Sequence, residues 1–108
     1  MGLKEAIPKE WTVRLAKRFS VLAAPARLEL VNRLLADGEL CVQQLAEATD
    51  QKQPSASKHL AALNREGLVS RRREGSRVVY RVVDPTLVAV CALMCGQIRQ
   101  ETPAETVR

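Results

Sequence analysis

The stretch QPSASKHLAALNREGLV, residues 53–69, decides the fold of this 108-residue chain. It begins with a proline, which has no N–H to lose in the first turn of a helix, and with serines that can accept hydrogen bonds from the free N–H groups of that turn. Its apolar residues recur at helical spacing and form an inner stripe, namely Ala56, Leu60 and Leu63. After Gly67 the sequence turns β-branched and arginine-rich. We therefore predict a helix from residue 53 to about Gly67.

The opposite face of this helix is polar, small at its tip and basic, and it carries Gln53, Ser55, Ser57, Lys58 and His59. In a helix-turn-helix, the second helix enters the major groove of DNA with its N-terminal residues against base edges. Glutamine and serine can bond bases or phosphates, and lysine and histidine can reach the backbone. These five residues are therefore our predicted DNA contacts on the helix. For His59, the chain's single histidine, a surface or packing role is an equal alternative.

In residues 68–84 the sequence pattern changes from the helical repeat to a period of two residues, which is typical of strands. This part reads LVSRRR, then the turn EGS and then RVVYRVVD. This alternation predicts a two-stranded hairpin directly after the helix. Such a hairpin would be a wing that lies along DNA phosphates or in the adjacent minor groove. We predict phosphate contacts from Arg72, Arg73 and Arg77, although a merely solvated hairpin would carry arginines too.

Two helices are predicted before residue 40. In the first, over about residues 9–23, large apolar residues recur at helical spacing, namely Trp11, Leu15, Phe19 and Leu22. We expect Trp11 and Phe19 to lie in the core or in a dimer interface. The second helix begins at Pro25 and ends near Gly38. Its expected inner face is Leu28, Val31 and Leu35.

Two more helices complete the chain. A short helix is predicted over residues 40–50, and the residues expected to face the core are Val42, Leu45 and Ala46. Asp84 and Pro85 suit the start of the last helix. One side of that helix carries Leu87, Cys91, Met94, Cys95 and Ile98. The order of four helices, a hairpin and a fifth helix predicts a mostly helical (α+β) winged helix-turn-helix.

Composition limits the number of domains in this chain and indicates where in the cell it is located. The chain is 46% hydrophobic and can bury one small core, so we predict a single domain over residues 1–108, with a core of about 9–100 and frayed ends. No apolar run is long enough to span a membrane, and the N-terminal MGLKEAIPKEW lacks the apolar stretch of a secretory signal. We expect a cytoplasmic protein with no membrane partner.

Positive charge is concentrated in one part of the chain. Residues 52–81 contain eight lysines and arginines but only two glutamates, a net charge of +6, whereas the whole chain carries +5. A basic half on a nearly neutral body is typical of a protein that docks on a polyanion with one face. Charge alone does not exclude an ordinary solvated surface.

Four segments, in this order, resemble the arsenic-repressor (ArsR/SmtB) family of bacterial winged-helix repressors: LAAPARLELVNRLL, ELCVQQLAEA, QPSASKHLAALNREGLV and RRREGSRVVYRVVD. The resemblance covers roughly residues 10–100. It implies a homodimer that pairs through its first and last helices and a double-stranded, inverted-repeat DNA operator. It also implies release from that operator by a metal ion, a metalloid or a thiol-reactive species.

The chain departs from the family pattern in the turn before the recognition helix. Family members usually carry glycine and then an aliphatic residue where this chain has Asp50 and Gln51. Aspartate tolerates the left-handed backbone better than most residues, so we expect the turn to survive. The loss of the aliphatic anchor is expected to loosen it.

The three cysteines, an odd number in a chain without a secretion signal, argue against a disulfide scaffold. Cys41 matches the first cysteine of the family's metalloid motif, but Gln43 replaces the second. Of the family's other metal site, only Asp84 is left, because Thr86, Gln97 and Gln100 stand at the matching positions. No certain cofactor is therefore implied.

Cys91 and Cys95 lie four residues apart, a spacing that puts two thiols on one face of a helix. One hypothesis is that this pair, with Cys41 or a cysteine of a second subunit, binds a thiophilic ion such as arsenite, Cd(II) or Zn(II). Another is that the same thiols are oxidised as a redox switch. The alternative, slightly favoured, is that they pack as small hydrophobic residues.

Two other classes of function compete with a repressor. A winged helix can serve as a protein-interaction module without an operator, but a docking face should then expose apolar anchors rather than a polar tip. An enzyme is the weakest option, because the sequence has no glycine-rich phosphate loop, no partner for its histidine and no acidic cluster. We therefore predict a protein that is not an enzyme.

Overall fold

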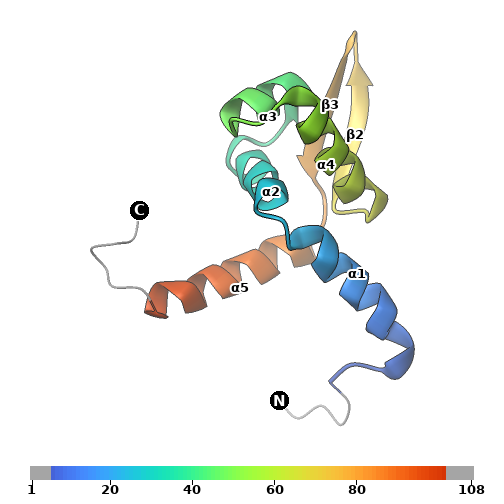
Figure 1. Ribbon diagram of the computed structural model, residues 1–108, viewed down its shortest axis with the longest axis vertical. Coiled ribbons are helices and arrows are strands. Elements are labelled where there is room, and N and C mark those ends of the chain that lie inside the picture. Colours follow the sequence, from blue (N-terminus) through green and yellow to red (C-terminus); the bar gives the residue numbers. More distant parts are fainter. Residues whose placement is uncertain (1–5, 102–108) are drawn as a thin grey trace.

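The computed structural model describes residues 6–101 and confirms the winged helix-turn-helix (Figure 1). Its elements are a 3-10 turn η1 (Lys9–Trp11), α1 (Thr12–Leu22), α2 (Pro25–Asp37), β1 (Leu40–Cys41), α3 (Val42–Ala48), α4 (Gln53–Arg65), β2 (Val69–Glu74), β3 (Arg77–Val82) and α5 (Pro85–Glu101). The fraying expected at the chain ends falls largely on residues outside this range. None of the helices in the described range is long and apolar enough to cross a membrane.

The core lies between α2, α3, α4 and the sheet, and Leu87 of α5 closes it. The predicted inner stripe of α4 is confirmed, since Ala56, Leu60 and Leu63 are all fully buried. The predicted inner face of α2 is wrong in two of its three positions. Leu28 and Leu35 are 41% and 42% exposed, whereas the buried residues of α2 are Leu30, Val31 and Leu34. Two apolar stripes compete on this helix, and packing against α3 and α4 selects one of them.

The sheet has three antiparallel strands in the order β1-β3-β2, one more than the predicted hairpin. Leu40 and Cys41 pair with Tyr80 and Val79 of β3, so α3 begins at Val42 rather than at residue 40. A capping box sets this start, because the Cys41 N–H donates to Oε1 of Gln44 at 2.9 Å while the Cys41 side chain accepts from the Gln44 N–H. The sequence did not predict β1, because a strand of two residues is too short to show the alternation of apolar and polar residues that indicates a strand.

The helices α1 and α5 project from this body in different directions (Figure 1). Both expose large apolar side chains along their length. Trp11 and Phe19 are 56% and 55% exposed, so the part of the prediction that placed them in the core is wrong. On α5, the expected inner side is buried only at Leu87, while Leu93 is 75% exposed. The chain alone therefore leaves apolar side chains on both helices without a complete packing partner.

Candidate nucleic-acid interface

The turn between α3 and α4 holds the two helices of the motif at a fixed angle. Asp50 has φ 54°, the left-handed conformation predicted for it, and no other non-glycine residue of the described range has a positive φ. Gln51 donates two hydrogen bonds at this turn, although its side-chain Oε1 is buried without a partner in the described part of the chain. Its backbone N–H donates to the Ala46 carbonyl at 2.9 Å, and its side chain Nε2 donates to the Ala26 carbonyl of α2 at 3.0 Å. A polar tether thus replaces the aliphatic anchor.

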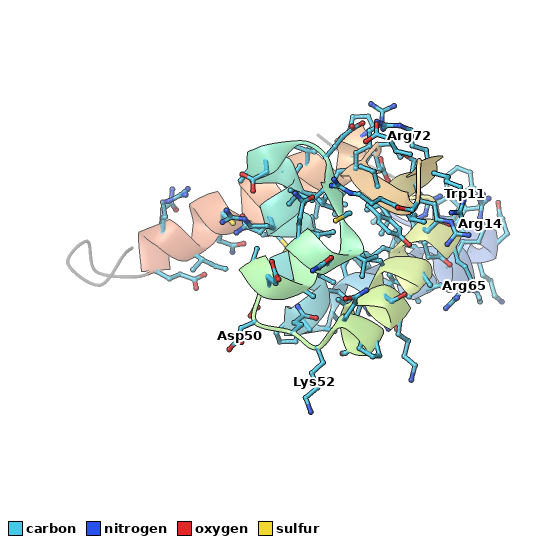
Figure 2. The ribbon with its side chains drawn as sticks, turned by 90° about the horizontal axis from the view of Figure 1, so that it is seen from above. Trp11, Arg14, Asp50, Lys52, Arg65 and Arg72 are labelled. Carbon is cyan, nitrogen blue, oxygen red and sulfur yellow. The ribbon has the colours of Figure 1, made fainter. Side chains whose placement is uncertain are left out.

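The first turn of α4 presents a thin polar surface. Four of the five residues of this helix that are predicted to contact DNA are exposed, namely Gln53, Ser55, Ser57 and Lys58. None of these four side chains makes a hydrogen bond or ion pair to another part of residues 6–101, so their donors and acceptors are available to a ligand. Figure 2 shows Lys52 extending away from the body at the start of the same helix, next to Asp50 of the turn. The helix N-terminus adds free N–H groups that favour an anion.

His59, the fifth predicted contact, is only partly exposed. Its Nδ1 accepts a hydrogen bond from Nε of Arg27 at 3.1 Å. Burial, followed by the positive charges of Arg27 and Lys58, lowers the pKa of His59 below its ordinary value. Both causes favour the neutral imidazole. No pattern in the sequence indicated this contact with α2.

The wing carries its arginines in different environments. Arg72 forms ion pairs of 2.7 Å with both Glu39 and Glu74, and these carboxylates raise its pKa further above the usual range. Nη2 of Arg77 donates to Oε1 of Gln44 at 3.2 Å. Arg73 is exposed and makes no such bond within the part of the chain that the structure describes. Its guanidinium is therefore the least engaged of the three predicted wing contacts.

The wing and the helix-turn-helix share one hollow. A groove of about 700 Å³ lies between the starts of α3 and α4 and the turn of the wing, and its lining includes Gln43, Gln53, Ser57, Ser76 and Arg77. Predicted contacts from the helix and from the wing thus face a common space.

The three cysteines do not come together. Cys41 is buried at the start of α3. Burial alone would raise the pKa of its thiol, but the Gln44 N–H, Arg77 and the Gln43 N–H together lower it below the ordinary value. Cys91 is partly buried, and burial followed by neighbouring Cys95 raises the pKa of its thiol. Residues 6–101 contain no cluster of three or more His, Cys, Asp or Glu side chains able to hold a metal ion. The predicted trio is therefore not assembled within one chain.

Comparison with known proteins decides the family. The sequence pattern described as bacterial regulatory protein, arsR family, matches residues 24–71. The antimony-specific transcriptional repressor AntR is 30% identical, with a TM-score of 0.81 over 91% of this chain and 88% of that one. The chain belongs to the arsR family. This confirms the predicted resemblance and places the chain among transcriptional regulators rather than enzymes.

Two other similar proteins show how far the likeness extends. A homodimeric winged helix-turn-helix DNA-binding domain from Mycobacterium bovis, a possible ArsR-family transcriptional regulator solved by NMR, is 30% identical with a TM-score of 0.75, over 100% of this chain and 98% of that one. The arsenical resistance operon repressor of Escherichia coli is 47% identical over 64 residues, which are 59% of this chain and 55% of that repressor. The match thus spans about half the length of the latter.

Proposed function

We propose that this chain binds a double-stranded, inverted-repeat operator as a homodimer and represses transcription. The observation that carries the proposal is the exposed and unengaged polar start of α4, which shares a groove with the basic wing in an arsR-family chain. The polar side chains of α4 would read base edges, and the arginines of the wing would contact phosphates. Among the residues described, the start of α4 exposes no large apolar anchor, which disfavours a protein-docking role for it.

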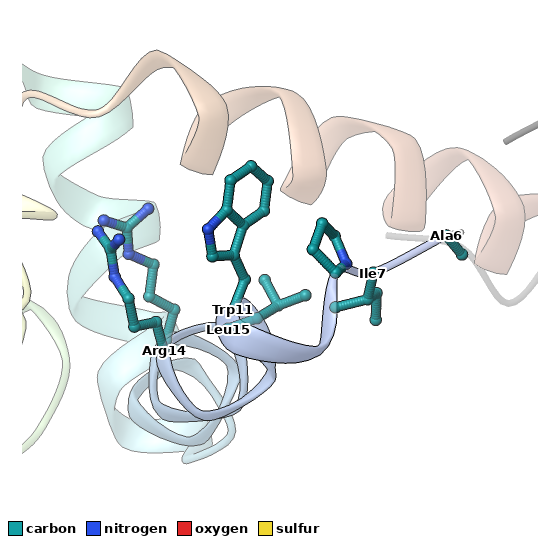
Figure 3. Close-up of a pocket in the computed structure, with 7 residues that line it drawn as sticks. Ala6, Ile7, Trp11, Arg14 and Leu15 are labelled. Carbon is teal, nitrogen blue, oxygen red and sulfur yellow. The ribbon is translucent and has the colours of Figure 1, made fainter. Parts of the chain in front are cut away.

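Dimerisation through α1 and α5 is supported by the apolar surface that both helices expose. At the start of α1, a hollow of about 350 Å³ is lined mainly by apolar side chains, among them Ile7, Trp11 and Leu15. Figure 3 shows Trp11 and Arg14 standing on the same side of this segment. A two-fold dimer would place its two copies of α4 in major grooves about 34 Å apart, as an inverted repeat requires.

Neutralising the wing tests the electrostatic part of the proposal. We expect the protein to bind a fragment of its own promoter with a steep dependence on salt, measured by fluorescence anisotropy. Arg73→Gln should weaken binding and lower the magnitude of the slope of log K against log salt by about 2, one phosphate contact per subunit. Neutralising Arg72, Arg73 and Arg77 together should abolish specific binding.

The matched control is Arg33→Gln, an exposed arginine of α2 that pairs with Asp37 at 3.1 Å. It removes the same charge outside the proposed interface and should leave the slope unchanged. Binding that is insensitive to salt or blind to sequence would contradict the repressor function.

We propose that the inducer is thiol-directed and acts on Cys91 and Cys95. Cys95 is exposed, and Cys91 lies beside it on α5, the helix that would also carry the dimer contact. Two thiols do not complete a site for arsenite, Cd(II) or Zn(II), so a bound ion would need donors from the second subunit as well. A modification at this place would release DNA by favouring a dimer geometry in which the two recognition helices no longer fit successive grooves.

Titrating the DNA-bound, reduced protein with arsenite, Cd(II), Zn(II) and an oxidant separates these possibilities. We expect at least one of them to release the DNA, and Cys91→Ser to abolish that release. Cys41→Ser is the matched control, because Cys41 lies on another element, and it should leave release unchanged. If none of these agents releases the DNA, the two thiols of α5 serve in packing.

A further inference from the structure

Arg27 joins three helices at one point. It lies in the first turn of α2 and is partly buried. Its Nε donates to Nδ1 of His59 on α4 at 3.1 Å, and its Nη1 donates to the Val21 carbonyl in the last turn of α1 at 3.2 Å. The last carbonyls of a helix have no partner within the helix, so a cation that donates to one of them also stabilises the helix end.

The bond to Arg27 fixes which imidazole nitrogen of His59 carries the proton. A guanidinium can only donate, so Nδ1 of His59 must be the unprotonated acceptor. The single N–H of the neutral ring is then at Nε2. His59 follows Ser55 by four residues, which places it on the same side of α4, one turn further from the tip. The ring therefore supplies a neutral donor beside the polar surface of that helix.

We propose that Arg27 is a positioning residue for DNA binding, which holds His59 as a neutral Nε2–H donor and ties the recognition helix to the end of α1. This proposal rests on the proposed repressor function, and it goes beyond that function by assigning a role to a residue of α2 outside the groove. It also assigns a polar link between α4 and the helix proposed to form the dimer.

The proposal fixes the sign of a pH effect. The charges that act on His59 are both positive, Arg27 from α2 and Lys58 from α4 itself, and α1 contributes the uncharged Val21 carbonyl through Arg27. Protonation would convert Nδ1 from an acceptor into a donor facing the Nε–H of Arg27. The contact would then break, so DNA affinity should fall as the pH drops below the ordinary histidine range. A free imidazolium beside phosphates would have the opposite effect.

NMR of the imidazole tests the contact without DNA. His59 is the only histidine, so its ring signals are unambiguous. We expect a long-range ¹⁵N–¹H correlation spectrum at pH 7.5 to place the proton on Nε2, and the histidine to titrate below its ordinary pKa. In Arg27→Met, both tautomers should appear and the pKa should rise, because one of the two positive charges that lower it is gone while burial and Lys58 remain. Arg33→Met, from the same helix, is the control and should leave the spectrum of His59 unchanged.

Anisotropy titrations at constant ionic strength between pH 7.5 and 5.5 test the consequence for DNA. Arg27→Met should bind about tenfold more weakly at pH 7.5, since each dimer carries two copies of the contact, and should lose the drop in affinity at low pH. His59→Gln, whose amide does not titrate, should show no drop in affinity between pH 7.5 and 5.5.

Three results would overturn the proposal: a proton on Nδ1 in the wild type, an unchanged affinity and pH profile in Arg27→Met, or a wild-type affinity that rises as His59 is protonated. A wild-type protein that binds no promoter DNA would overturn the repressor function itself. In that case the NMR spectrum still decides whether Arg27 fixes the ring, so the two failures are distinguishable.

Discussion

Replacing Gln53 by glutamate should weaken operator binding at least about a hundredfold while leaving the fold and the dimer intact. Gln53 is the first residue of α4, is exposed, and lines the groove shared with the wing. A carboxylate there would face phosphates and base acceptors. Its repulsion, partly screened by salt, should cost about 1.4 kcal/mol or more at each of two half-sites, which multiplies to a factor of about a hundred.

The substitution is nearly isosteric, and a carboxylate in the first turn of a helix interacts favourably with the helix dipole. The melting temperature should therefore not fall, which separates a lost contact from a lost fold. Gln100→Glu makes the same chemical change near the end of α5 and should keep operator affinity within a few-fold. Anisotropy measures both variants. Equal affinities for the two would mean that the start of α4 does not lie against DNA.

The fold was predictable where one periodicity dominates a segment. Residues 53–65 carry a single apolar stripe between a proline and a glycine, and the helix, its buried face and its exposed tip all follow from that pattern. In α2 the sequence offers two overlapping stripes, and only the packing of neighbouring helices shows that Leu34 is buried and Leu35 is not. The two residues of β1 form a strand because β3 lies beside them, not because of any preference visible in the sequence.

For the candidate DNA-binding site, the sequence could predict which residues take part but not which contacts they make within the protein. The polar tip of α4 and the arginines of the wing could be named from composition and position. The engagement of Arg72 by Glu39 depends on residues 33 positions apart that only the sheet brings together. The same holds for Arg27 and His59, which are 32 positions apart on two helices. No local sequence pattern encodes such pairs. The sequence therefore shows which charged and polar side chains are present, but not which of them are already paired within the protein.

The double variant Met94→Glu, Ile98→Glu should be a folded monomer that has lost its operator. Met94 and Ile98 are four residues apart on α5, are 58% and 55% exposed, and lie outside the core cluster of the chain. Residues 85–98 contain no charged side chain, so α5 is apolar on every side, which is typical of a helix that is covered on every side. A second copy is the covering that the proposed dimer provides.

The size of the effect follows from the area that the dimer would bury. Each of these side chains is worth about 1.5 kcal/mol or more when buried, and a two-fold interface contains every contact twice. Four lost contacts therefore amount to about 6 kcal/mol, or more than a ten-thousandfold weaker dimer. A monomer reaches only one half-site, so operator affinity should fall by more than a hundredfold.

Light scattering and anisotropy on the same samples measure the two consequences. Loss of the dimer should lower the melting temperature and remove its dependence on protein concentration. The circular dichroism spectrum at low temperature should still be that of a folded helical protein, because neither residue belongs to the core cluster. Arg99→Glu, a charge change on the neighbouring residue of α5, is the control and should remain dimeric. A double variant that is still a dimer would place the interface elsewhere. A monomer with full operator affinity would show that the second subunit is not needed to read DNA.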